Sequence, residues 1–196
     1  MNDLLAKAIL RLKEFNDDEL ALFLSCFKTR RLEKGDFFIN EGCLCEFLGF
    51  VNSGMLRAYF LKDGDERILQ FYFPDYWVAE FLNIESKEPA EISIQALEPC
   101  EIQTITCEKM WEMNEVIPNF KLFGQMLINQ RFVFFRKRTM SFLRDSPELR
   151  YKKLLQEQAE EIEKIPLQYI ASYLGIRPES LSRIRKRLSE DSLSFL

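Results

Sequence analysis

The stretch LQYIASYLGIRPESLSRIRK, from Leu167 to Lys186, is the part of the sequence that most directly decides the fold. It contains two short apolar-periodic segments separated by a glycine. Ala171 is small enough for a second helix to cross close to the first, and Gly175 permits the positive φ of a tight turn. The spacing predicts a helix-turn-helix, whose angle is buried by Ile170, Leu174, Ile176, Leu181 and Ile184. The alternative is an ordinary helical pair inside a core.

The second helix of this motif is expected to begin at Pro178, because proline at the first helical position loses no backbone donor. In this motif the N-terminal end of the second helix enters the major groove of DNA. Arg183 can bind guanine in a bidentate manner and Glu179 can accept a hydrogen bond from cytosine, with Ser180 beside them. Glu179 and Arg183 can equally form an i,i+4 ion pair. Contacts to phosphates are expected from Arg177, Arg185, Lys186 and Arg187.

The charge around this motif differs in sign from that of the whole chain. Residues 177–187 contain five basic side chains and one acidic side chain, a local charge of +4, whereas the chain of 196 residues has a net charge of −4. A local positive surface on an acidic chain is the electrostatic pattern expected for a binder of double-stranded DNA. Histidine is absent, which excludes Ser-His-Asp and Cys-His catalysis and histidine zinc sites. With no glycine-rich phosphate loop either, we expect no enzyme, no metal and no cofactor.

Cysteine content and hydropathy bear on the compartment. The five cysteines include no CxxC pair and are odd in number, which predicts free thiols in a reducing cytoplasm. The N-terminal segment lacks the shape of a signal peptide, and no apolar run approaches the roughly 20 residues that cross a bilayer. We therefore expect a cytoplasmic protein with no membrane partner.

Upstream of the motif, residues 119–143 form a long apolar-periodic segment without proline. A helix of this length projects beyond a small domain, so its apolar stripe needs a partner. That partner is either the rest of the chain or a second copy, and we expect a dimerisation helix. Ser146 as a cap and Pro147 at the first helical position predict a further helix that ends near Glu163.

The N-terminal half shows a different pattern. Residues 2–28 are predicted to be helical, with a break at 16–18. Short apolar runs then alternate with turn residues, and Lys62-Asp63-Gly64-Asp65 is a strong hairpin signal. Strands at this spacing predict a compact antiparallel barrel or sandwich. The expected strands are 37–39, 47–51, 55–60, 68–73, 92–96 and 101–105.

The order of a β-rich module, a long helix and a helix-turn-helix resembles the CRP/FNR regulators, named after the cyclic-AMP receptor protein, over nearly the whole chain. The resemblance rests on Glu33-Lys34-Gly35-Asp36, on Val51-Asn52-Ser53-Gly54 and on PESLSRIRK. It implies an α+β fold with a β-roll (a jelly-roll-like double-stranded β-helix) at 1–117, a dimerisation helix at 118–144 and a DNA-binding helix-turn-helix domain at 145–196. It further implies a homodimer that controls transcription at an inverted DNA repeat and contacts RNA polymerase.

The effector cassette of that family is incomplete in this sequence. Ligand-binding members carry a Gly-Glu pair, followed ten residues after the Glu by Arg-Ser or Arg-Thr. Glu80 matches, but Ala79 replaces the glycine, Ala90 replaces the arginine and Glu91 replaces the hydroxyl residue. Loss of a buried charge partner typically costs about 2–5 kcal/mol, so tight binding of cyclic AMP is not expected. A loop shift could bring Lys87 in as a substitute cation.

Other ligands of the family fit this sequence no better. The cysteines do not match the iron–sulfur ligand set of the oxygen-sensing branch, and the haem-binding branch often uses a histidine. An unidentified small-molecule effector is the open alternative, and the second functional hypothesis is a sensor module that engages DNA weakly. Five aromatic side chains either line a pocket for such an effector or belong to the core. They are Tyr59, Phe71, Phe73, Trp77 and Phe81.

The resemblance also implies a winged helix, with a β-hairpin after the recognition helix. Here the sequence after Leu188 is SEDSLSFL, which is too short for a full hairpin. Wing contacts with DNA are therefore not expected, and Phe195 and Leu196 are expected to pack back on the domain.

Overall fold

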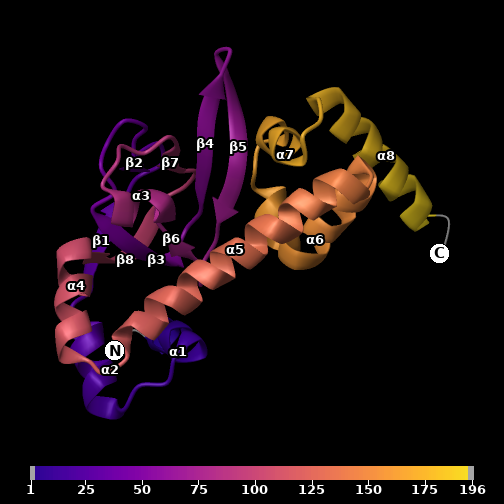
Figure 1. Cartoon of the computed structure of the whole chain (residues 1–196). Coiled ribbons are helices and arrows are strands. Elements are labelled where there is room, and N and C mark those ends of the chain that lie inside the picture. The colour runs from indigo at the N-terminus through magenta and orange to yellow at the C-terminus, as the bar shows by residue number, and fades with distance from the viewer. Residues whose placement is uncertain (1–2, 194–196) are drawn as a thin grey trace.

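The computed structural model describes residues 3–193 and has its two β-sheets at one end of a long diagonal helix and a group of helices at the other (Figure 1). Two helices come first, α1 (Asp3–Leu12) and α2 (Asp17–Ser25). The break between them contains Asn16, whose side chain accepts a hydrogen bond from the N–H of Glu19 while the Glu19 carboxylate accepts one from the N–H of Asn16. This capping box sets the start of α2.

Eight strands form two four-stranded antiparallel sheets, with the orders β1-β8-β3-β6 and β2-β7-β4-β5. The predicted hairpin joins β4 to β5, and its turn has positive φ at Asp63 and Gly64, as its sequence requires. The strands are β1 (Lys28–Leu32), β2 (Phe37–Ile39), β3 (Phe47–Ser53), β4 (Leu56–Lys62), β5 (Asp65–Tyr72), β6 (Trp77–Val78), β7 (Ser93–Ala96) and β8 (Cys100–Thr106).

Two short strands and a short helix depart from the sequence-based expectation. The N-terminal helical region was expected to reach residue 28, but α2 ends at Ser25 and Lys28 begins β1. The sequence of β1, KTRRL, has no clear strand pattern because β1 is an edge strand, and charged residues suit an exposed edge. The two-residue strand β6 and the helix α3 (Phe81–Ser86) are too short to give a periodic signal.

The remaining helices are α4 (Cys107–Val116), α5 (Phe120–Arg144), α6 (Pro147–Glu163), α7 (Leu167–Leu174) and α8 (Pro178–Leu193). The predicted cap of α6 is present, since the Ser146 hydroxyl accepts a hydrogen bond from the N–H of Leu149 at 3.2 Å. The same helix is interrupted at Gln158, where φ is −150°. The long helix α5 runs from the β-sheets to the helical end (Figure 1).

Two apolar cores hold these elements together. The first fills the space between the sheets and extends to α1, α2 and the start of α5, where Phe23 contacts Phe120 and Phe123 edge-on. The second joins the outer face of β5 to α6, α7 and α8. The second core therefore fixes the helix-turn-helix to the sheet domain.

Two further expectations concern the packing of the C-terminal residues and the lack of a membrane-spanning segment. The predicted packing of Phe195 and Leu196 lies outside the described residues. Within residues 3–193, no helix combines the length and the apolar character that a membrane span requires.

Candidate functional site

The predicted helix-turn-helix is formed by α7 and α8. Gly175 ends α7 with φ +69° and donates to the carbonyl of Ser172, while the N–H of Ile176 reaches the carbonyl of Ala171 at 3.0 Å. These two hydrogen bonds form a Schellman motif, which needs a residue of positive φ. A Cβ on Gly175 would lie 2.8 Å from Cε1 of Phe142, so the neighbouring helix α5 also requires glycine here.

Two arginines bind the C-terminal carbonyls of α7. Arg138 of α5 donates to the carbonyl of Tyr173 at 2.7 Å, and Arg150 of α6 donates to that of Leu174 at 2.9 Å. Cations at this end of a helix also complement its dipole. Both arginines lie beside the ring of Phe142, at 4.9 and 4.7 Å from its centroid. No local pattern in the sequence indicates this arrangement, because the partners come from three helices.

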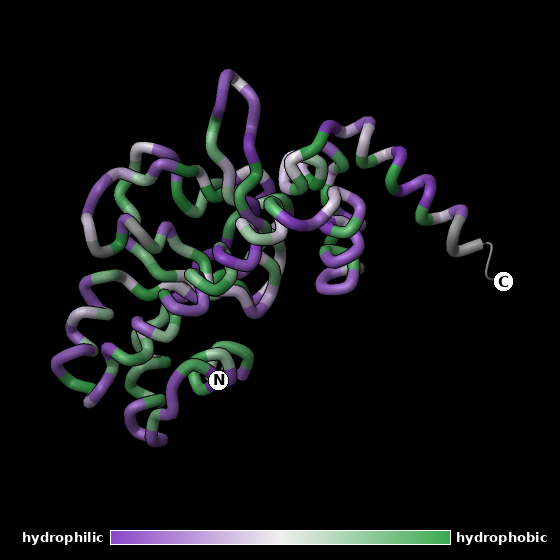
Figure 2. Tube along the Cα trace, turned by 45° about the vertical axis from the view of Figure 1, so that its right-hand side comes forward, coloured by the Kyte–Doolittle hydropathy of each residue, from purple (hydrophilic) through white to green (hydrophobic). Residues whose placement is uncertain are grey.

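The helix α8 buries one side and exposes the other. Leu181 and Ile184 pack in the second core, and the tube of α8 alternates between hydrophobic and hydrophilic residues along its length (Figure 2). The helix α8 lies at the outer end of the molecule, on the far side of α7 from the sheets (Figure 1). This is a long, uncovered helical surface of the kind that fits a DNA groove.

The residues predicted to read bases lie on that surface. Glu179 and Arg183 are exposed near the start of α8, and Ser180 is half-buried. No side-chain hydrogen bond or ion pair joins Glu179 or Arg183 to any described residue, so the alternative of an i,i+4 pair between them is not formed. Arg177, just before the helix, is likewise exposed and without an ion-pair partner in the described part of the chain.

The residues predicted to bind phosphates divide into two groups. Arg185 is half-buried and donates through Nε to the Tyr151 hydroxyl at 3.0 Å, so its side chain ties α8 to α6. Arg187 pairs with Glu148 of α6 at 3.1 Å, although 62% of its side chain is exposed. Lys186 is 78% exposed, with only a long contact of 3.8 Å to Glu190. Arg177 and Lys186 are therefore the more accessible cations.

The residues of the incomplete effector cassette meet at one loop of the sheet domain. Cys45 Sγ accepts a hydrogen bond from the N–H of Glu80 at 3.4 Å, and the Cys43 carbonyl accepts one from the N–H of Ala90 at 2.8 Å. Ala79 and Ala90 are buried in the first core. Glu91, at the position of the hydroxyl residue, is exposed.

The side chains considered as ligand contacts are placed differently from the expectation. Lys87 is exposed, and its Nζ lies 4.8 Å above the ring of Trp111 in α4. The five aromatic residues do not share one pocket. Tyr59, Phe71 and Phe73 belong to the second core, where Phe71 lies 5.3 Å from Tyr173, whereas Trp77 belongs to the first core and Phe81 packs against it.

Polar side chains that the sequence did not single out occur at this site. The amide of Asn83 in α3 donates to the carbonyls of Glu88 and Pro89 and holds the chain that follows α3. Arg131 of α5 is 9% exposed, and its Nε and Nη1 have no acceptor among the described residues. Burial lowers the pKa of Arg131. Burial raises the pKa of Tyr72, and the charge of Arg131 partly offsets that rise. The amide nitrogen of Gln70, two residues before Tyr72 on β5, is also buried without an acceptor.

The long helix α5 carries an uncovered apolar face. It contains six basic residues and no acidic residue, and it buries Phe120, Phe123 and Leu127 against the sheets. Its opposite side is exposed in the single chain and carries many apolar side chains among polar ones. The exposed side chains are Leu122, Met126, Ile128, Phe132, Val133, Phe135, Met140, Phe142 and Leu143.

These elements define a class of protein: a β-roll domain joined by a long helix to a helix-turn-helix. Residues 29–115 match the family model of the cyclic nucleotide-binding domain. A relative is the transcriptional activator protein Anr of Pseudomonas aeruginosa, 30% identical over 95 residues, which are 48% of this chain and 38% of that protein. The matched region thus spans well under half of the curated relative. The family model covers less than half of this chain, and over most of its length the chain is similar in fold to solved CRP/FNR-type regulators.

Solved structures agree with this fold. FixK2 from Bradyrhizobium japonicum is similar with a TM-score of 0.75 and 16% identity, covering 85% of this chain and 86% of that chain. The c-di-GMP-responsive regulator CLP of Xanthomonas campestris is similar with a TM-score of 0.70 and 19% identity, over 91% of this chain and 94% of that chain. A regulator of the CRP/FNR family from Eubacterium rectale is similar with a TM-score of 0.69 and 23% identity, over 90% of this chain and 85% of that chain.

Proposed function

We propose that this protein is a homodimeric, sequence-specific DNA-binding regulator of transcription. The observation that carries the proposal is the exposed start of α8, where Arg177, Glu179 and Arg183 have no ion-pair partner among the described residues. A guanidinium and a carboxylate side by side on an uncovered helix can bind base edges in the major groove, and Lys186 and Arg187 can reach phosphates. The division at 1–117, 118–144 and 145–196 and contact with RNA polymerase are part of the same proposal.

The exposed face of α5 supports the dimer. Apolar patches of this extent usually mark an interaction surface, and a two-fold axis along a long helix allows the same residues of two copies to meet. A symmetric dimer would present its two α8 helices to successive major grooves, about 34 Å apart on one side of the DNA. The expected target is an inverted repeat.

The effector cassette supports binding to DNA without cyclic AMP. Ala90 stands where ligand-binding members carry the arginine that pairs with the cyclic phosphate, and it is 2% exposed within the first core. Its N–H and carbonyl are both engaged, by the carbonyl of Cys43 and the N–H of Gly42. The site therefore offers a cyclic phosphate no charge partner at this position.

The proposal is tested by selection from a random DNA library with the purified protein at moderate salt and without added ligand. Recovery of an inverted repeat is the expected result. Arg183→Ala should then lose about 1–3 kcal/mol of affinity and relax the preference at one base position. The comparison variant is Lys186→Ala, which should weaken binding to all sequences alike and lower the salt slope by about 1. Equal binding of the selected site by Arg183→Ala and the parent protein would contradict the assignment.

A second candidate function is a sensor of a small anion, and a specific observation favours it. The buried donors of Arg131 and Gln70, both close to Tyr72, have no acceptor among the described residues. Unpaired buried donors are costly, and an anion or a water molecule would satisfy them. Titration calorimetry with inorganic phosphate and with succinate tests this function. Binding that Arg131→Met abolishes would support it, and no heat with either anion would count against it.

A further inference from the structure

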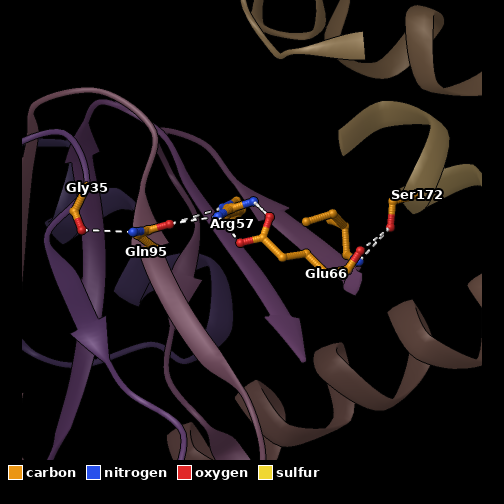
Figure 3. A network of polar contacts seen from close by, with 6 residues as sticks. Gly35, Arg57, Glu66, Gln95 and Ser172 are labelled. Carbon is orange, nitrogen blue, oxygen red and sulfur yellow. Dashed lines mark hydrogen bonds and ion pairs between the residues drawn. The ribbon is translucent and has the colours of Figure 1, made fainter. Parts of the chain in front are cut away.

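The edge strand β5 leaves one side of its backbone without a neighbouring strand, and α7 covers that side. The Ser172 hydroxyl of α7 donates to the carbonyl of Glu66 at 3.0 Å and accepts from the N–H of Ile68 at 3.0 Å. One side chain thus satisfies both backbone groups that β5 turns outward at this point (Figure 3). The contact joins residues more than 100 positions apart and connects the sheet domain directly to the helix-turn-helix.

A buried charged network supports the same contact from the sheet side. Arg57 of β4 is 4% exposed, forms a two-pronged ion pair with Glu66 and lies 4.0 Å from the ring centroid of Tyr169 in α7. Arg57 also donates to Gln95 at 2.8 Å, and Gln95 donates to the carbonyl of Gly35 at 2.9 Å (Figure 3). The network therefore runs across β5, β4 and β7 and ends at the turn before β2.

The long helix contacts the same place. Arg138 of α5 donates to the carbonyl of Tyr173 and, at 3.5 Å, to the carbonyl of Ile68, and its guanidinium lies 3.7 Å from the centroid of the Tyr173 ring. The residues 66–68 and 172–173 are thus the meeting point of β5, α5 and α7. Because α8 packs on α7 through Leu181 and Ile184, this meeting point fixes the direction of α8 relative to α5.

We propose that Ser172 is a positioning residue that sets the half-site spacing of the dimer. The inference rests on the proposed function, because it needs two copies joined along α5. When α7 is fixed to both α5 and β5, the two α8 helices stand at a fixed separation and rotation. One inserted base pair turns a half-site by about 34° and moves it by about 3.4 Å, which a rigid dimer does not tolerate. Without the hydroxyl, α7 loses its two hydrogen bonds to β5, and the orientation of α7 and α8 then depends on the second core and on the hydrogen bond from Arg138.

The test compares the parent protein, Ser172→Ala and Ser172→Thr by fluorescence anisotropy on three DNA probes. The probes are the selected inverted repeat, the same repeat with one base pair inserted at its centre, and a single half-site. Ser25→Ala is the control variant, because the Ser25 hydroxyl also makes a backbone hydrogen bond, to Leu22 in α2, away from this contact. Hydrogen exchange of the Ile68 amide reports whether the contact itself has opened.

In the parent protein and in Ser25→Ala, the insertion should weaken binding at least tenfold. In Ser172→Ala the Ile68 amide should exchange faster, and affinity for the correct repeat should fall about tenfold. The inserted base pair should then weaken binding by less than threefold. Ser172→Thr keeps a hydroxyl and should restore spacing dependence. Half-site binding should be equal in all four proteins.

Three results would overturn the proposal. The first is full spacing dependence in Ser172→Ala despite faster exchange at Ile68. The second is loss of half-site binding in that variant, which would mean that the hydroxyl supports the fold of the helix-turn-helix and not its placement. The third is a parent protein that binds the half-site but ignores the insertion. A parent protein that binds no selected DNA would instead refute the proposed function, on which this inference rests.

Discussion

Replacement of Phe132 by glutamate should dissociate the proposed dimer. Phe132 is 64% exposed, and at about 100° per residue it lies near the middle of the exposed face of α5, with Leu143 and Ile128 within about 40° of it. Burial of a fully exposed phenylalanine contributes about 1.5–3 kcal/mol, so the exposed part of Phe132 accounts for about 1–2 kcal/mol in each chain. Two copies give about 2–4 kcal/mol, or roughly a 30- to 1,000-fold increase in the dissociation constant of the dimer. The buried charge of two glutamates would add to this.

Sedimentation velocity over a concentration series measures that constant directly. Leu44→Glu is the matched control, because Leu44 is 54% exposed in the loop before β3 and belongs to no part of α5. Circular dichroism should show the same helix content in both variants. A Phe132→Glu protein that dimerises as strongly as the Leu44→Glu protein would refute the assignment of this face as the interface. Loss of the dimer in both variants would refute it as well, since the effect would then not be specific to α5.

Three further outcomes follow from individual residues. Gly175→Ala should lower the free energy of unfolding by about 1–2 kcal/mol, because φ is +69° and the new Cβ meets Phe142; urea denaturation measures this, with Gly124→Ala as a helical glycine whose Cβ meets nothing. Hydrogen bonds from Lys153 and Ser141 hold the pKa of Asp145 at about 2, below its ordinary 3.8. The stability from this carboxylate is therefore complete above pH 3.8 and lost as the pH falls towards 2. Asp145→Asn should flatten the dependence of urea stability on pH in that window, and an unchanged slope would contradict the assigned role. Calorimetry with cyclic AMP should detect no tight binding, and submicromolar affinity would show that the cassette is functional.

Several elements of the fold could be predicted from local sequence. The order of Ala171, Gly175 and the apolar positions around them predicted α7, the turn and the start of α8, because small residues, positive φ and helical periodicity are properties of adjacent residues. The Ser146-Pro147 cap and the Asp63-Gly64 turn were predictable for the same reason. The exposure of Arg183 and Glu179 also follows from their place on the helix, opposite Leu181 and Ile184.

Other features depend on partners that the local sequence does not name. The strand β1 has a charged, pattern-free sequence and is a strand because β8 pairs with it. Arg185 and Arg187 look like their neighbours Arg183 and Lys186 in the sequence, yet α6 supplies a hydroxyl to one and a carboxylate to the other. Both side chains thus make contacts within the chain that their sequence neighbours Arg183 and Lys186 do not share.

By itself the sequence determined the helix-turn-helix, its polar face and the loss of the cassette arginine at Ala90, since each is a matter of residue type at a given position. Only the tertiary structure decided where that helix-turn-helix is held. Ser172 is an ordinary helical serine until β5, 106 positions away in the chain, presents the carbonyl of Glu66 to it. The backbone groups of an edge strand must find partners, and which side chain reaches them is fixed only when the elements pack.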